Sequence, residues 1–501
     1  MKFRTMIACA FAVWLGASAL PANEQVEQLK LQLQQMREEF AKTRLQQQLQ
    51  IDALSRKLNE LAAAEPDAAT GNGQAKTDEQ KKLEQELAGE LTASIPPAGA
   101  TPASEPLAQT SSASTSTPAF AGARPGSAYM NISFGTLIDA GWSSAADPSA
   151  QLELGDHDPI KRGFALRNAE IAVDGAIDPY FKGFANIVLK LDGNNQTQIE
   201  LEESFLQSTS LPANLQLKVG QYFASFGRQN PQHPHTWAFV DQPLILGRTF
   251  GPDGLRSIGT QLSWLAPTPF YTELFLSVLD GQGGTAFSFR NPGNPDSDGV
   301  NRYAGRATLD RTLRGAQDLL FVPRIASSFE LTDTQTLLVG LSGAIGPNDT
   351  GPHRRTEVYG VDVFWKWKPA DAAQGFPYIT WQTEALYRNF QAGADPLAPV
   401  PLAAETLRDR GFYSQVVYGF VPRWNAGLRL DFVTGNDAAF DASNPYRGAR
   451  YRISPELTFL PSEFSKIRLQ YNFDHGDLFG NAHSIWMQFE FGLGAHAAHK
   501  Y

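Results

Sequence analysis

The charged residues that could do chemistry gather in one proline- and glycine-rich segment, residues 227–257. The segment carries three arginines and two aspartates: Arg228, Asp241, Arg248, Asp253 and Arg256. It also carries an apolar cluster that a freely solvated loop would expose to water: Trp237, Phe239, Val240, Leu244, Ile245 and Leu246. We predict that the segment folds back against the inner wall of a hollow structure, where opposed charges would screen solutes by size and charge. An external lid or a contact between subunits is the alternative.

Metal and catalytic chemistry have weaker support in the sequence. His233 and His235 are separated by one proline and could bind a metal if a third ligand approached. Two histidines alone are weak evidence for a metal site, so we predict solvated loop histidines and assign no metal. Hydrolase elbows, glycine-rich nucleotide loops and His-Glu-x-x-His motifs are absent. We therefore expect no catalytic residue, no cofactor and no enzyme activity.

The elements that would position these residues are strands with one apolar face. Residues 485–493 send Ile, Met, Phe, Phe and Leu to one side, and Trp, Gln, Glu and Gly to the other. Residues 426–432 and 467–474 repeat this alternation. A soluble sandwich would also alternate in this way. About sixteen such segments are long enough to cross a membrane when tilted: 132–143, 164–177, 180–192, 198–209, 214–224, 258–266, 270–280, 321–332, 335–346, 355–368, 378–390, 410–421, 424–434, 450–460, 465–475 and 483–495.

The connections between these segments differ in length on the two sides. Short turns are predicted at residues 177–180, 211–214, 266–269, 331–334 and 460–463, and long polar stretches at 281–320 and 391–409. Apolar residues make up 42% of the chain and aromatic residues 11%, which suits a barrel with an apolar exterior and an aromatic girdle. We predict an all-β fold, a transmembrane antiparallel β-barrel of about sixteen strands.

The residues before the barrel divide into three segments. Residues 1–22 have two basic residues, an apolar run and small residues, which is the pattern of a signal peptide. Cleavage of this peptide would remove Cys9. Residues 23–64 carry an interrupted apolar seam, which predicts a periplasmic coiled coil or, alternatively, a single amphipathic helix. Residues 65–126 are rich in Ala, Pro and Ser and predict a disordered linker. Residues 127–501 form the predicted barrel.

Seven short stretches of the predicted barrel carry a resemblance to known proteins: residues 169–175, 184–187, 203–206, 217–223, 225–227, 239–242 and 247–248. Together they resemble the porin O and P family of outer-membrane channels, often called phosphate-selective porins. The resemblance covers the chain from about residue 130 and implies a sixteen-stranded trimeric channel. Phosphate-selective members are expected to line the pore with many basic residues, whereas acidic residues outnumber basic ones here both in the whole chain, of net charge −10, and after the linker. The family's substrate is therefore not carried over.

Taken together, these patterns predict an outer-membrane porin that passes small hydrophilic solutes or ions by diffusion. Its predicted partners are outer-membrane lipid, two further copies in a homotrimer, small solutes and, through the coiled coil, the cell wall. The acidic balance excludes nucleic acid. Two other functions stay open: a structural tether acting through the coiled coil, and a metal-related uptake receptor. The latter would need a plug domain and about twenty-two strands.

Overall fold

The computed structural model describes residues 129–494 with the exception of 193, 210, 296–297, 310, 437, 439–446 and 478. The predicted signal peptide, coiled coil and linker (residues 1–126) lie outside the described residues. In the described part of the chain, no helix is both long enough and apolar enough to cross a membrane.

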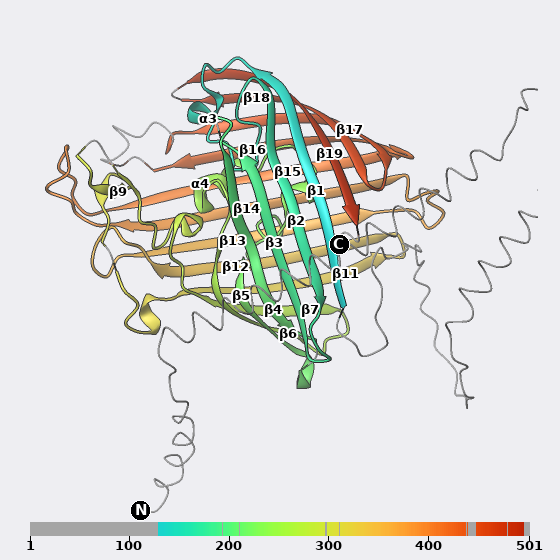
Figure 1. Cartoon of the computed structure of the whole chain (residues 1–501), viewed down its shortest axis with the longest axis horizontal. Helices are drawn as coiled ribbons and strands as arrows, with labels where there is room; N and C mark the ends of the chain where they lie inside the picture. The colour runs from blue at the N-terminus through green and yellow to red at the C-terminus, as the bar shows by residue number, and fades with distance from the viewer. Residues whose placement is uncertain are drawn as a thin grey trace, which may run out of the picture. The chain divides into compact units, whose positions relative to one another are not determined.

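Sixteen antiparallel strands close into one barrel (Figure 1). They are β1 (Tyr129–Ser143), β2 (Gly163–Ala176), β3 (Phe181–Leu191), β4 (Thr197–Ser208), β5 (Leu215–Phe223), β6 (Arg256–Leu265), β7 (Tyr271–Leu279), β11 (Leu320–Thr332), β12 (Gln335–Pro347), β13 (Arg355–Trp367), β14 (Tyr378–Ala392), β15 (Glu405–Val421), β16 (Trp424–Gly435), β17 (Arg450–Ser462), β18 (Ser465–Gly476) and β19 (Gly480–Gly494). Each strand pairs with its neighbours in sequence order, and β1 closes the ring on β19.

The remaining elements are short and lie in the connections. The β7–β11 connection holds a small sheet of β8 (Asn294–Pro295), β9 (Asn301–Tyr303) and β10 (Arg306–Ala307). The helices are α3 (Pro148–Gln151), α4 (Leu244–Phe250) and the 3-10 turns η1 (Pro212–Asn214), η2 (Pro234–Thr236), η3 (Gly284–Ala286) and η4 (Ala316–Asp318).

The predicted barrel is confirmed, and its sixteen predicted segments each overlap one barrel strand. The largest shift is at β15, which begins at Glu405 instead of residue 410. This earlier start follows from pairing, because Glu405 lies opposite Ala392, so the ladder with β14 extends beyond the apolar part of the strand.

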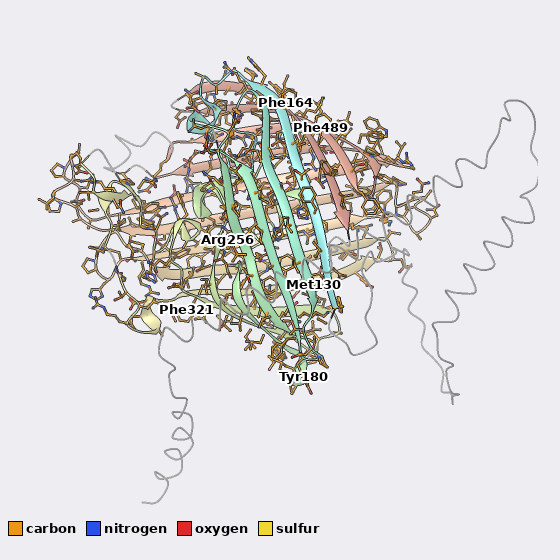
Figure 2. All side chains as sticks on the ribbon, in the orientation of Figure 1. Met130, Phe164, Tyr180, Arg256, Phe321 and Phe489 are labelled. Atoms are coloured by element: carbon orange, nitrogen blue, oxygen red, sulfur yellow. The ribbon has the colours of Figure 1, made fainter. Side chains whose placement is uncertain are left out.

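The barrel is apolar outside and polar inside. Along β19 the side chains of Ile485, Met487 and Phe489 are exposed, whereas Gln488 and Trp486 are buried. A continuous exposed apolar surface on alternate strand positions is the pattern that lipid requires. Figure 2 marks Phe164 toward one end of this surface and Met130 toward the other.

The two ends of the barrel carry connections of different length. Short turns join β2 to β3, β11 to β12, β15 to β16 and β17 to β18, and Tyr180 in Figure 2 marks the first of them. At the opposite end the longest connections join β1 to β2, β5 to β6 and β7 to β11. The predicted division into a short-turn end and a long-loop end therefore matches these connections.

Candidate functional site

Residues 224–255, here named the inner loop, join β5 to β6. Asn230 closes the base of this loop: its side-chain amide donates hydrogen bonds to the carbonyl oxygens of Ala224 and Leu255 and accepts one from the backbone N–H of Leu255. The backbone N–H of Ala224 also donates to the carbonyl oxygen of Leu255 at 2.9 Å. The two ends of the inner loop are therefore hydrogen-bonded to each other where the loop leaves the barrel wall.

Helix α4 lies in the second half of the inner loop. It begins directly after Pro243, whose ring holds φ at −61°, and its last residue, Phe250, is followed by Gly251 at the C-cap position. Gly251 has a φ of 83°, a left-handed conformation that glycine adopts without steric cost.

The inner loop contacts opposite sides of the barrel. On one side, His233 Nδ1 lies 2.8 Å from Glu202 Oε2 on β4. On the other, α4 packs against β14, β15 and β16, and Arg388 of β14 donates to the carbonyl oxygen of Arg248 at 3.0 Å. In the closed strand order, β4 and β15 stand eight places apart in either direction. The inner loop therefore crosses the interior of the barrel.

Apolar packing holds α4 against the wall. Ile245 is 0% exposed and Phe250 is 1% exposed. Burying one such side chain contributes roughly 1.5–3 kcal/mol. Their neighbours in this apolar cluster come from the loop, from β5, β7, β11–β16 and from the β7–β11 connection. The cluster is Tyr222, Ala224, Phe226, Leu244, Ile245, Leu246, Phe250, Leu255, Leu279, Ala286, Phe289, Leu320, Val322, Ala344, Val358, Leu386, Tyr413 and Val433.

Asp241 ties the inner loop to β16, β17 and β18. Its side chain is 1% exposed and accepts hydrogen bonds from Arg429 at 2.6 Å and Arg452 at 2.7 Å. It also accepts hydrogen bonds from Gln470 at 2.8 Å and Asn472 at 2.7 Å. Burial raises the pKa of Asp241, but the two guanidinium groups outweigh it and hold this pKa at about 2. Asp241 is therefore a carboxylate at neutral pH.

Arg248 links the inner loop to a second connection. Its guanidinium forms a two-pronged pair with Glu153 of the β1–β2 connection, at 3.0 and 2.8 Å, and Arg450 reaches the same carboxylate at 3.2 Å. The ion pairs that continue from these contacts along β14–β18 form what we call the arginine network: Arg248, Arg388, Arg429, Arg447, Arg450 and Arg452 with Glu153, Asp241, Asp409, Asp431 and Asp474. Arginines outnumber carboxylates in it.

The opposite wall carries a histidine–carboxylate cluster, which consists of His157, Glu170, Glu202, Glu203, His233, His235 and Asp253. His233 lies between two carboxylates of β4, with Nδ1 2.8 Å from Glu202 and Nε2 2.9 Å from Glu203. His235 Nδ1 lies 2.8 Å from Glu170 of β2, and its ring stacks on His233.

The prediction that His233 and His235 are solvated is wrong. Their side chains are only 12% and 8% exposed, because inward-facing carboxylates of β2 and β4 meet the loop at this point. Burial lowers the pKa of His233, but the Glu202 and Glu203 carboxylates outweigh it and hold this pKa well above its ordinary value.

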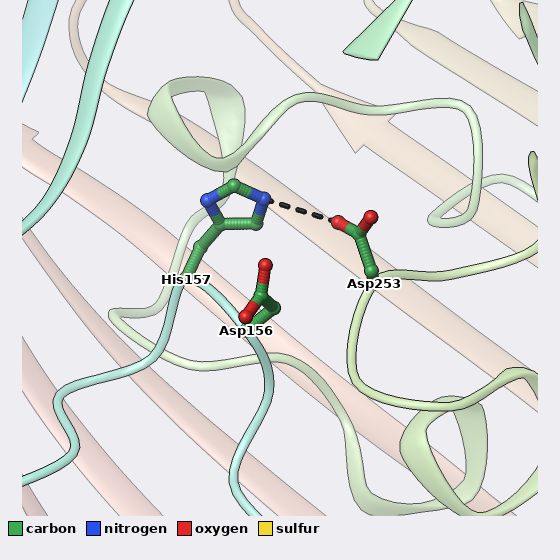
Figure 3. Close-up of side chains that lie close together, drawn as sticks. All are labelled: Asp156, His157 and Asp253. Atoms are coloured by element: carbon green, nitrogen blue, oxygen red, sulfur yellow. Dashed lines mark hydrogen bonds and ion pairs between the residues drawn. The ribbon is translucent and has the colours of Figure 1, made fainter. Parts of the chain in front are cut away.

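Figure 3 shows the edge of this cluster, where the β1–β2 connection meets the end of the inner loop. His157 Nε2 lies 3.2 Å from Asp253 Oδ1 and 3.5 Å from Glu202 Oε1. Asp253 also accepts a hydrogen bond from Arg256 at 2.5 Å, and Arg256 pairs with Glu200. Burial lowers the pKa of His157, yet its carboxylate neighbours hold it well above the ordinary value.

The five arginines and aspartates predicted for the site lie in three places. Asp253 and Arg256 pair with each other beside the histidine–carboxylate cluster, and Asp241 and Arg248 belong to the arginine network. Arg228 lies apart, with its guanidinium 3.8 Å from the ring centre of Phe364 and a hydrogen bond of 3.2 Å to Gln382.

Sequence reasoning missed the partners of these residues. Glu153, Glu202 and His157 come from other connections and strands, and nothing in their local sequence marks them. The alternation of β4 predicts only that every second side chain faces inward. The resulting site has an arginine-rich wall at β14–β18 and a wall at β2 and β4 whose carboxylates meet histidines of the inner loop and of the β1–β2 connection.

Several solved structures are similar to this chain. The outer-membrane channel DcaP of Acinetobacter baumannii has a TM-score of 0.47 and 11% identity, over 74% of this chain and 99% of DcaP. An anion-selective porin from Comamonas acidovorans has a TM-score of 0.45 and 6% identity, over 73% of this chain and all of the porin. OmpF of Salmonella typhi has a TM-score of 0.43 and 12% identity, over 73% of this chain and 97% of OmpF.

No family model matches the chain, so the resemblance to the porin O and P family stays a prediction. An uncharacterized protein of Aquifex aeolicus (strain VF5) is 32% identical over 362 residues, which cover 68% of this chain and 71% of the relative. The chain belongs to the same family as this Aquifex aeolicus protein.

Proposed function

We propose that the protein is an outer-membrane channel for passive diffusion of small hydrophilic solutes or ions, and that the inner loop forms its constriction. The observation that carries this proposal is a closed sixteen-stranded barrel, apolar outside and polar inside, crossed by a loop that contacts opposite walls. Barrels of sixteen to eighteen strands are wide enough for an aqueous channel. A loop across such a lumen leaves narrower passages beside it.

The charges at the constriction would act on permeating ions. Arginines outnumber carboxylates in the network at β14–β18, whereas the histidine–carboxylate cluster gathers three carboxylates of β2 and β4 and Asp253 of the inner loop. Opposed walls of this kind set an electric field across the lumen, which orders dipolar solutes and selects among ions. Asp241, Arg248, Asp253 and Arg256 would contribute as members or neighbours of these walls, and Arg228 would add a charge from its separate place beside Phe364 and Gln382.

The two other functions drawn from the sequence fit less well. A plugged metal receptor needs about twenty-two strands, and this barrel closes with sixteen. The tether depends on residues 23–64, which lie outside the described residues. We keep the homotrimer and the periplasmic position of this segment as proposals that native mass measurement of the intact protein and of a chain without residues 23–64 would test.

Solute entry into liposomes tests the proposed function. Liposomes that contain the folded protein should swell in an isotonic solution of a small sugar, and liposomes with heat-denatured protein should not, because the denatured chain has no barrel. Equal swelling of the two preparations would contradict the channel.

Replacing Arg248 and Arg256 together with Ala should shift ion selectivity toward cations. Each arginine pairs with carboxylates, so their loss removes one of two positive partners from Glu153, Glu200 and Asp253 and makes this part of the site more negative. The zero-current potential in a salt gradient measures this shift. It should be larger at 0.1 M salt than at 1 M, since the screening length falls from about 10 Å to about 3 Å.

The matched control removes two arginines from the outward face of β15. Arg408 and Arg410 are exposed and lie on the opposite face from Asp409. The R408A/R410A variant should keep the wild-type zero-current potential. If R248A/R256A leaves the potential unchanged as well, the inner loop does not set the selectivity.

A further inference from the structure

Three side chains of the histidine–carboxylate cluster lie close together and are of types that bind metal ions. Glu170 comes from β2, Glu202 from β4 and His233 from the inner loop, and each offers one ligand atom within 4.8 Å of the other two. All three side chains are largely buried, at 5%, 1% and 12% exposure. One imidazole and two carboxylates form a ligand set that Zn²⁺ and similar first-row divalent ions accept.

The surroundings of this triad resemble the supporting contacts of metal ligands. A histidine that binds metal through one ring nitrogen usually bonds a carboxylate or carbonyl through the other. The Nδ1 atom of His233 faces Glu202, while its Nε2 atom is held 2.9 Å from Glu203. Glu170 is oriented in the same way by His235 at 2.8 Å. Each of these two ligands therefore has its own orienting partner.

One ligand oxygen of the triad lacks a hydrogen bond. Glu202 Oε1 is fully buried and accepts no hydrogen bond from any residue that the structure describes; the nearest ring nitrogen of His157 lies 3.5 Å away. An unsatisfied buried carboxylate oxygen is costly. A bound cation would satisfy it and would offset the repulsion between Glu170 and Glu202.

We propose that Glu170, Glu202 and His233 bind a first-row divalent metal ion such as Zn²⁺, which fastens the inner loop to β2 and β4. The fourth position falls to water. Metal–ligand bonds of about 2.0–2.2 Å place the ligands of a tetrahedral ion a few ångströms apart, and the three ligand atoms lie within 4.8 Å of one another. Mg²⁺ and Ca²⁺ prefer all-oxygen shells of six or more ligands and do not fit this set.

Equilibrium binding to the full-length protein in detergent tests this site. After removal of metal with a chelator, the protein should take up one Zn²⁺ per chain in competition with a chromophoric zinc indicator. His233→Gln should weaken binding by more than about 100-fold, and Glu203→Gln, which removes only the orienting partner, by about 10–100-fold. Excess Mg²⁺ should not displace the Zn²⁺.

Three controls separate this site from other outcomes. His483→Gln changes an exposed histidine of β19 that contacts Tyr471, and it should bind Zn²⁺ like the wild type. Glu202→Gln keeps the shape of a ligand and should also lose binding, so a folding defect in one variant does not decide the result. Binding that survives H233Q but is lost in H496Q/H499Q belongs to the C-terminal histidines and overturns the proposal, as does a stripped wild type that takes up no Zn²⁺. None of these outcomes depends on whether the barrel conducts.

Discussion

Replacing residues 227–252 with three glycines should make the barrel permeable to much larger solutes. The change removes α4 together with the ion pairs of Asp241 and Arg248 with β15–β17, while the backbone pair between Ala224 and Leu255 can still close the β5–β6 connection. An unobstructed lumen of sixteen strands is an aqueous channel. We expect liposome swelling in a trisaccharide to rise roughly tenfold relative to the intact protein, because hindered diffusion falls steeply once the passage is wider than the solute.

A matched control shortens a different connection of the barrel. Replacing residues 438–446, between β16 and β17, with three glycines should leave trisaccharide entry at the level of the intact protein. If both shortened proteins swell alike, the increase comes from a general loosening of the barrel. If neither swells faster than the intact protein, the inner loop does not limit permeation.

Asp241→Ala should lower the free energy of unfolding by about 3–5 kcal/mol, the range for removing one member of a buried set of ion pairs. The substitution removes the carboxylate that Arg429 and Arg452, each 1% exposed, share, and leaves each arginine with one carboxylate in place of two. It also removes the acceptor of Gln470 and Asn472. The measurement is denaturant unfolding of the purified protein in detergent, followed by tryptophan fluorescence.

Asp298→Ala is the control for this prediction. Asp298 pairs with Arg302 in the β7–β11 connection, where it is exposed to solvent. Exposed pairs contribute little to stability, so unfolding of this variant should match the wild type. The account would be contradicted if the Asp241→Ala protein were as stable as the Asp298→Ala protein. It would also be contradicted if a protease added to the folded Asp241→Ala protein cut the inner loop no faster than in the wild type.

The barrel could be predicted because each strand shows, in its own residues, the alternation of apolar and polar side chains. In residues 485–493 the alternation alone identifies Ile485 and Phe489 as outward, and the structure leaves both exposed. Trp486 shows where this reasoning ends. Its position on the predicted wet face is correct, yet the side chain is 1% exposed, because its ring lies against Gly141 of the neighbouring strand β1. Alternation along a strand predicts whether a side chain faces inward or outward. It does not predict which other residues cover that side chain.

The site was harder to predict because its contacts join distant residues. Asp241 meets Arg429, 188 residues later, and His233 meets Glu202, 31 residues earlier. The composition of residues 227–257 indicated a buried loop, since an exposed one would not carry Phe239 or Ile245. It could not indicate where along the wall each charge would lie, which depends on the path of the loop across the lumen. The histidines were assigned to solvent for this reason.

Single-channel recording in a planar lipid bilayer tests the central claim most directly. The intact protein should insert and produce discrete, reproducible conductance steps, and the protein in which residues 227–252 are replaced should produce steps roughly fivefold larger, as expected for a barrel whose lumen is no longer crossed. An absence of steps from both proteins, although each is folded and inserted, would contradict the channel; equal steps from both would contradict a constriction formed by the inner loop.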